Sequence, residues 1–167
     1  SNIKNKDRHQ IKIIDCSLEN LNSRSVELRE KILEFKPDVL GISFWSPNYY
    51  EALSILMLAK SIDPNMTTVV GGPHATSYSD KVMENGEIDF LFRGEADISF
   101  SIFLDELEEK VPDLSKVKGL TYRDSGGELV DNGQDFQENL DLIQLPDYEA
   151  INLDGTAQEI TWGKACR

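Results

Sequence analysis

The sequence predicts an α/β domain in which a doubly wound, mostly parallel sheet of five strands carries helices on both faces. Two observations predict this class. Short β-rich or wholly apolar runs recur along the chain, and apolar residues at helical spacing lie between them. Strand and helix alternate four times, which is typical of parallel strands joined by right-handed crossovers.

Five segments are expected to form strands because each is short, rich in β-branched or apolar residues and bounded by turn residues. They span 11–15, 39–44, 67–70, 88–92 and 119–123. The second is nearly all apolar, as in a strand covered on both faces. A turn signal at 124–127 predicts a hairpin that returns over 128–130, so one edge of the sheet is expected to be mixed.

Four helices are expected between these strands, over 28–35, 52–59, 79–85 and 100–107. Leu28, Ile32 and Phe35 illustrate the helical spacing of apolar residues in the first. Prolines follow the first and last helices, and an Asp-Pro-Asn turn follows the second, so each is expected to end there.

Length, charge and composition limit the classes of function that the chain can have. The 167 residues suffice for one domain, and a formal charge of −13 argues against nucleic-acid binding, because phosphates would be repelled. No apolar run is long enough to span a membrane and no signal peptide is evident, so we expect no membrane partner. Two cysteines, far apart, do not form a disulfide framework, and a cytoplasmic location is expected.

The ends of the strands carry the candidate binding residues, because ligands of open α/β sheets bind beyond the carboxyl ends of the strands. Glycines there allow close backbone approach, small hydroxyls offer hydrogen bonds, and Trp45 offers a flat apolar surface. This set suits a bulky, partly apolar ligand with a polar tail. The residues concerned are Asp15, Ser17, Ser43, Trp45, Asn48, Gly71, Gly72, Pro73, His74, Thr76, Arg93, Gly94 and Glu95.

Each candidate also has an ordinary structural interpretation. The Gly71–Gly72 pair suits a tight turn, and Asp15 suits a helix cap or loop acceptor. Trp45 suits a partly buried aromatic residue and His74 a surface loop. An ion pair between Arg93 and Glu95 would be another such role. Their shared position at one edge of the sheet supports a binding role more strongly than any one of these residues does alone.

Several signatures are absent. No G-x-G-x-x-G follows the first strand, which disfavours a dinucleotide, and neither a P-loop nor a G-x-S-x-G elbow is present. Histidines and cysteines lack zinc-site spacing. A phosphoacceptor receiver domain is disfavoured because its acidic pair and its lysine are not evident.

The order of four segments resembles the B12-binding domain of radical-SAM proteins, the group of anaerobic magnesium-protoporphyrin monomethyl ester cyclases and class B methylases. These segments are Lys36-Pro37-Asp38-Val39-Leu40-Gly41-Ile42-Ser43, Pro47-Asn48-Tyr49, Val70-Gly71-Gly72-Pro73-His74-Ala75-Thr76 and Arg93-Gly94-Glu95. The resemblance implies a flavodoxin-like (Rossmann-like) fold over 11–134 that holds cobalamin at the candidate residues named above.

The resemblance also implies how the chain is divided. Residues 1–10 are expected to be a disordered or tag-adjacent end. Residues 135–167 are expected to be a linker, with Leu145-Pro146-Asp147-Tyr148, and the start of a radical-SAM domain. Cys166 in Gly163-Lys164-Ala165-Cys166 resembles the first ligand of that domain's iron–sulfur cluster.

The parent protein is therefore expected to be an enzyme that uses a [4Fe-4S] cluster, S-adenosylmethionine and cobalamin for methyl transfer or oxidative cyclisation. This chain alone would be non-catalytic, with the carboxyl-terminal radical-SAM domain as its partner. Classical B12 domains carry a cobalt-ligating histidine where Asp15-Cys16-Ser17 stands, and this chain has none there. The alternatives are a cofactor-free docking or substrate-selecting module and, less favoured, a flavin mononucleotide-binding electron carrier.

Overall fold

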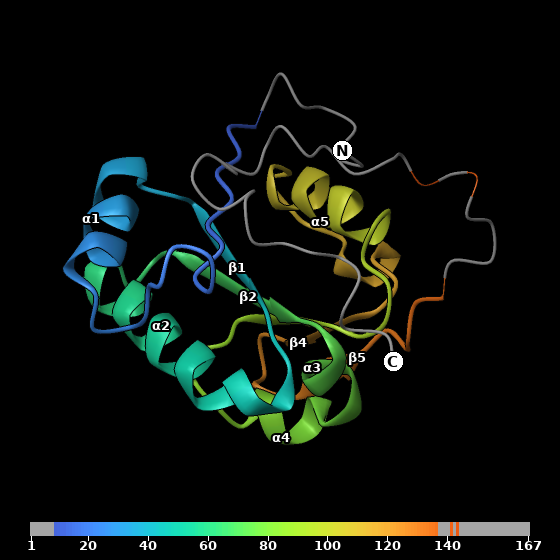
Figure 1. The fold of residues 1–167 in the computed structure, drawn as a ribbon. Coiled ribbons are helices and arrows are strands. Elements are labelled where there is room, and N and C mark those ends of the chain that lie inside the picture. The colour runs from blue at the N-terminus through green and yellow to red at the C-terminus, as the bar shows by residue number, and fades with distance from the viewer. Residues whose placement is uncertain (1–8, 137–140, 142, 144–167) are drawn as a thin grey trace.

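The computed structural model describes residues 9–136, 141 and 143, which form an α/β domain on a five-stranded mixed sheet (Figure 1). The strands lie in sequence order across the sheet: β1 (Val39–Ser43), β2 (Thr67–Gly71), β3 (Phe90–Phe92), β4 (Leu120–Arg123) and β5 (Leu129–Asp131). β1, β2 and β3 are parallel, so their carboxyl ends meet at one edge, called the carboxyl edge below.

Helices cover both faces of the sheet. One face carries α1 (Val26–Phe35), α2 (Tyr49–Ile62) and two short helices, α3 (Pro73–Ser77) and α4 (Ser79–Met83); the other carries α5 (Ser99–Leu107) (Figure 1). Short 3-10 turns, η2 (Ser46–Asn48) and η3 (Leu114–Lys116), lie in the connections.

The core has one layer on each side of the sheet, as the alternation of side chains along a strand requires. Val70 and Leu91 pack with Leu56 of α2 on the first face, and Val69 and Phe92 pack with Phe103 of α5 on the second. Phe103 is fully buried, and its ring lies edge-on to that of Phe92 with centroids 5.5 Å apart.

The expectation of a mostly parallel sheet is wrong. β4 is antiparallel to β3, and β5 is antiparallel to β4, so only two of the four pairings are parallel. After α5 the chain returns to the carboxyl end of β3, where Leu120 pairs with Phe92, and β4 therefore runs back along β3. The expected hairpin is confirmed, with the amide of Asp124 donating to the Glu128 carbonyl at 2.9 Å.

The strand expected over 11–15 is not formed. Ile14 and Cys16 pack against the cluster that contains Leu28 and Ile32, whereas Ile11 and Ile13 stay about half exposed. In the part of the chain that the structure describes, the hydrogen-bonded neighbour of β1 is β2. A β-rich sequence becomes a strand only where a neighbouring strand supplies the ladder, and none of the described strands pairs with this run.

β1 is consequently an edge strand among the described residues. The amide of Phe44 donates to the Gly71 carbonyl at 3.2 Å, and the Asp38 carbonyl accepts from Thr67 at 2.9 Å. The backbone N–H and C=O groups of the even-numbered residues in β1 therefore point toward β2. Because these groups alternate along a strand, those of Gly41 and Ser43 point away from β2. Both of those residues are exposed.

The helix expected over 79–85 is confirmed with shorter bounds as α4, and an additional short helix, α3, precedes it and begins at Pro73. Proline is favoured at the first position of a helix because its fixed φ suits the helix and its missing amide is not needed there. The other three helices are confirmed with longer bounds.

A network of polar side chains lies at the amino ends of β2 and β3, opposite the carboxyl edge. A carboxylate oxygen of Asp89 accepts from Lys60 Nζ at 2.6 Å, from the Thr68 amide at 2.8 Å and from the Thr68 hydroxyl at 2.9 Å. These bonds tie α2, β2 and the start of β3 together. Among the described residues no helix is long and apolar enough to cross a membrane.

Candidate functional site

The carboxyl edge collects most of the residues that the sequence singles out. Ser43, Trp45 and Asn48 lie at or just after the end of β1. The end of β2 carries the run 71–76, and the end of β3 carries 93–95. These three groups come from parallel neighbouring strands, so the expected juxtaposition follows from the sheet register.

Gly72 is required by packing within the protein. Its φ is +96°, and a Cβ there would lie 2.7 Å from the carbonyl oxygen of Phe44 and 2.9 Å from Ser43 Oγ. The chain after β2 thus passes close to the end of β1. Of the two glycines at 71 and 72, Gly72 is the one that the tight turn requires. A Cβ on Gly71 would meet its nearest atoms, in Phe92, at 3.9 Å, an ordinary contact.

His74 links the loops after β1 and β2. Its Nδ1 lies 2.8 Å from Ser46 Oγ, and its ring lies 4.8 Å from that of Tyr49 and 4.9 Å from that of Tyr78, measured between centroids. Phe44 adds a further ring at 5.8 Å. The imidazole is partly buried within this cluster, so His74 is not an ordinary surface-loop residue.

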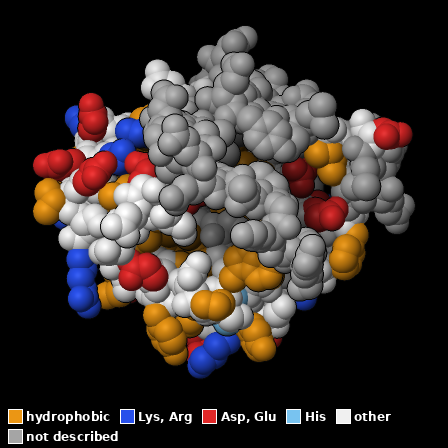
Figure 2. Space-filling view, in the orientation of Figure 1, with side chains coloured by type: hydrophobic (Ala, Val, Ile, Leu, Met, Phe, Trp, Pro, Cys, Tyr) orange, Lys and Arg blue, Asp and Glu red, His pale blue; other side chains and the backbone are white. Residues whose placement is uncertain are grey.

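Large aromatic side chains are exposed beside this cluster. Trp45 is 66% exposed, Tyr50 78% and Tyr78 57%. Figure 2 shows hydrophobic side chains gathered over α3, α4 and the start of α2. Trp45 is therefore not a buried core aromatic, and it offers a flat apolar surface next to the exposed Asn48.

Residues 93–95 are held by neighbours other than one another. The guanidinium of Arg93 pairs with the carboxylate of Asp131 in β5, and the amide of Gly94 donates to Thr76 Oγ1 at 3.0 Å. The ion pair that the structure gives to Arg93 is thus with Asp131, which ties β5 to the end of β3. Thr76 joins the loop after β2 to the loop after β3.

Asp15 and Ser17 lie in a turn of their own. Asp15 Oδ1 accepts from the amides of Ser17 at 2.9 Å and Leu18 at 3.0 Å, which is the local acceptor role that its sequence context allows. The next turn, at Ser23, reaches α2 through a hydrogen bond to the Glu51 carboxylate. This hydrogen bond joins the segment that follows Asp15 and Ser17 to the start of α2.

Partial burial raises the pKa of the Cys16 thiol, and the carboxylates of Asp15, Glu19 and Glu51 raise it further. The folded state therefore holds this proton more tightly than the unfolded chain does. Its stabilising contribution is complete below the thiol's unfolded pKa, roughly 8.5, and is lost as the pH rises through the folded value.

We expect Cys16 to be alkylated more slowly in the folded protein than in the urea-unfolded chain at pH 8.5, because the thiolate is the reactive form. The rates are measured with iodoacetamide by peptide mass spectrometry. The difference should narrow as the pH is raised toward 10. Equal rates at pH 8.5 would contradict the raised pKa.

Sequence reasoning missed some of the residues that hold this site together. Tyr49 and Tyr78 enclose His74, and Gly119 and Asp135 lie against the loop after β3. One signal was available for Tyr78, which follows His74 by four positions in a helical context. Cys166 and the linker motif 145–148 lie outside the described residues. Among those described, no three His, Cys, Asp or Glu side chains are grouped to hold a metal ion.

An α/β domain with exposed aromatic and polar side chains at the carboxyl ends of parallel strands is of the class that binds a ligand at that edge. The family model described as the B12 binding domain matches residues 2–104. The matched range contains β1, β2 and β3 and their carboxyl ends. The chain belongs to the B12-binding domain family.

Curated relatives carry this domain as part of longer proteins. An uncharacterized methyltransferase of Pyrococcus horikoshii is 31% identical over 150 residues, 89% of this chain and 32% of that protein. The anaerobic magnesium-protoporphyrin IX monomethyl ester cyclase of Rubrivivax gelatinosus is 31% identical over 107 residues, 62% of this chain and 19% of that protein. The chain thus spans 19–32% of these relatives' length.

Solved structures share the fold. The cobalamin-dependent S-adenosylmethionine radical enzyme OxsB, with aqua-cobalamin and S-adenosylmethionine bound, superposes with a TM-score of 0.71 at 18% identity, over 87% of this chain and 20% of that one. The radical S-adenosylmethionine methyltransferase TsrM from Kitasatospora setae gives 0.63 at 16% identity, over 75% and 24%.

Proposed function

We propose that this chain is a cobalamin-binding domain and that cobalamin lies over the carboxyl edge of β1, β2 and β3. The observation that carries the proposal is that the B12-binding match spans all three strand ends at which the exposed candidate residues gather. Cobalamin pairs a broad, largely apolar ring bearing amide side chains with a nucleotide tail, and a site for it needs both flat apolar surface and small polar groups.

The described residues fit those needs. The exposed indole of Trp45 supplies flat apolar surface, and the exposed Asn48 supplies an amide that both donates and accepts hydrogen bonds. Asn48 makes no side-chain cap bond to α2, so its side chain is not committed to the helix. Gly72 was expected to let its backbone approach the ligand closely. In the structure, the space left by its missing side chain is taken by the backbone of Phe44.

We propose further that the whole protein is an enzyme in which this domain serves a radical-SAM domain. Cobalamin would supply a transferable methyl group or assist a radical step, in a methyl transfer or an oxidative cyclisation. The residues of this chain would orient the cofactor and shield it from competing reactions, and the chain by itself would be non-catalytic. Cys166 would be the first ligand of the [4Fe-4S] cluster that cleaves S-adenosylmethionine.

The test is an anaerobic titration with hydroxocobalamin followed by desalting and visible spectroscopy. We expect stoichiometric retention by the unmodified chain and loss of at least about 90% of it in Asn48→Trp, because an indole there would occupy the edge. Asn65→Trp is the matched control, since Asn65 is also exposed and lies before β2, at the opposite end of the sheet. A tenfold loss of affinity corresponds to about 1.4 kcal/mol.

Equal retention by all three proteins would place cobalamin elsewhere on the domain, and no retention by the unmodified chain would remove the proposed function for this chain alone. A cofactor-free docking module is the second candidate, favoured by the exposed aromatic side chains of Trp45, Tyr50 and Tyr78. A flavin mononucleotide carrier is the weaker alternative and would give a yellow protein in place of a pink or orange-red one.

A further inference from the structure

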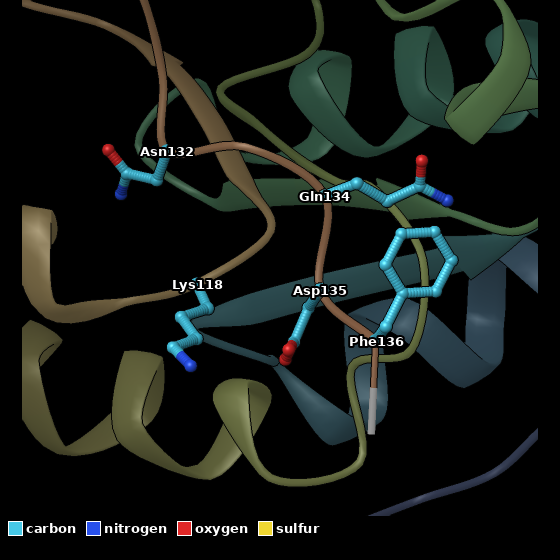
Figure 3. Close-up of a pocket in the computed structure, with 5 residues that line it drawn as sticks. All are labelled: Lys118, Asn132, Gln134, Asp135 and Phe136. Carbon is cyan, nitrogen blue, oxygen red and sulfur yellow. The ribbon is translucent and has the colours of Figure 1, made fainter. Parts of the chain in front are cut away.

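The segment after β5 turns back across the end of β3. The amide of Asp135 donates to the Arg93 carbonyl at 3.0 Å, and the amide of Glu95 donates to the Asp135 carbonyl at 3.1 Å. Gly94 and Asp135 form a parallel bridge through these bonds. We call this contact between residues 93–95 and Asp135 the clasp. Figure 3 shows Asn132, Gln134, Asp135 and Phe136 along the returning segment, with Lys118 opposite Asp135.

The clasp closes only because residue 94 is glycine. Gly94 has a φ of +87°, and a Cβ there would lie 2.0 Å from the carbonyl oxygen of Asp135. Contact distances between carbon and oxygen this short are not tolerated, so a side chain would force Asp135 away. The backbone conformation adds strain for any other residue.

Gly119, which lies just before β4, is beside the clasp, since a Cβ there would be 3.1 Å from Asp135 Cβ. The amide of Arg93 donates to the Gly119 carbonyl at 2.7 Å, and a Cβ on Gly119 would lie 2.8 Å from the Arg93 carbonyl. The ion pair of Arg93 with Asp131 holds the end of β5 at the same place. Three segments distant in sequence therefore meet at Arg93 and Gly94.

A hydrogen bond joins the clasp to the loop after β2. The amide of Gly94 donates to Thr76 Oγ1 at 3.0 Å, so the residue that admits Asp135 on one side also anchors the loop after β2 on the other. Moving Gly94 to relieve a clash with Asp135 would displace its amide from Thr76. The positions of Thr76 and Glu95 thus depend on whether the clasp is closed.

We propose that Gly94 and Asp135 are positioning residues, and that the clasp fixes both the path of the chain leaving the domain and the loops after β2 and β3 at the carboxyl edge. Opening the clasp would loosen those loops and weaken whatever they hold. The role of the clasp in ligand binding rests on the proposed function, whereas its role in fixing the chain and the loops does not.

The test compares Gly94→Ala with Gly127→Ala in the full 167-residue chain. The two glycines have nearly the same φ, +87° and +84°, but a Cβ on Gly127 meets nothing within 4 Å. Backbone strain is therefore matched, and only the clash differs. Amide hydrogen exchange is read at Glu95 and Asp135, whose amides close the clasp, and at Val70 in the sheet as a measure of global stability.

We expect exchange at Glu95 and Asp135 to accelerate at least about tenfold in Gly94→Ala beyond any change at Val70, and to follow Val70 in Gly127→Ala. Exchange at both amides that follows Val70 in Gly94→Ala would overturn the proposal. If Gly94→Ala does not fold, Asp135→Pro serves instead, because it removes the amide that donates to Arg93 and leaves β3 unchanged, and exchange is then read at Glu95 alone.

Hydroxocobalamin affinity separates the two proposals. Binding by the unmodified chain with at least about tenfold weaker binding by Gly94→Ala, and unchanged binding by Gly127→Ala, supports both. Unchanged binding by Gly94→Ala overturns the positioning role at the edge and leaves the proposed function standing. If the unmodified chain does not bind, the proposed function fails, and the exchange of Glu95 and Asp135 decides on the clasp.

Discussion

Replacing Gly72 with alanine should destabilise the folded protein by about 2–4 kcal/mol, since backbone strain and steric crowding act together. The φ of +96° is unfavourable for a residue with a Cβ, and that atom would lie 2.7 Å from the Phe44 carbonyl oxygen. The free energy of unfolding is measured by urea denaturation followed by circular dichroism.

Gly71→Ala is the matched control for this variant. Gly71 is the last residue of β2, and a Cβ there would meet Phe92 at an ordinary 3.9 Å. Alanine is also less costly than glycine within a strand, so a change within about 1 kcal/mol of the unmodified protein is expected. If the two variants unfold at the same urea concentration, the close approach of Gly72 to Phe44 does not govern stability.

Leu56→Ala should cost about 2–5 kcal/mol, because Leu56 is fully buried between α2 and the sheet and its removal leaves a cavity. The matched control is Leu33→Ala in α1, where the same substitution is made on a helix but the side chain is 43% exposed. That variant should lose less than about 1 kcal/mol. Equal losses in urea denaturation would contradict the packing of α2 described here.

The loss in Leu56→Ala has a consequence for the site. α2 begins directly after η2, so its packing sets the position of the loop that carries Trp45 and Asn48. A domain in which α2 is loosened should therefore hold that loop less precisely. Variants at the carboxyl edge should be compared only if each has the same free energy of unfolding as the unmodified protein.

The repeated β-strand and helix pattern made the central part of the fold predictable. Apolar runs such as Val69–Val70 are buried on both faces, and that pattern identifies strands without tertiary information. The run 11–15 shows the limit of this reasoning. Its composition is equally β-rich, but whether it joins the sheet depends on a neighbour that composition does not reveal.

The direction of β4 was unpredictable for a related reason. A helix between two strands favours a parallel pairing, but α5 has only nine residues and is followed by η3 and a return to the end of β3. Periodicity identifies such elements without giving the course of the chain between them. The hairpin was predictable because its turn chemistry is local.

The part of the candidate site that lies at the ends of predicted parallel strands could be predicted from the sequence. Ser43, Gly72 and His74 come together because parallel strands end at the same edge. The contact of Gly94 with Asp135 joins positions 41 residues apart through backbone atoms, and backbone contacts leave no signature in side-chain chemistry. The glycine was visible in the sequence, but the partner that requires it was not.

The outer edge of β1 bears on how the isolated chain should be handled. The backbone groups of Gly41 and Ser43 face away from β2 and both residues are exposed, so they form a short template on which a strand from another molecule can pair. Such pairing rises with concentration. Light scattering across a dilution series therefore belongs before any cofactor titration, so that ligand stoichiometry is counted per folded monomer.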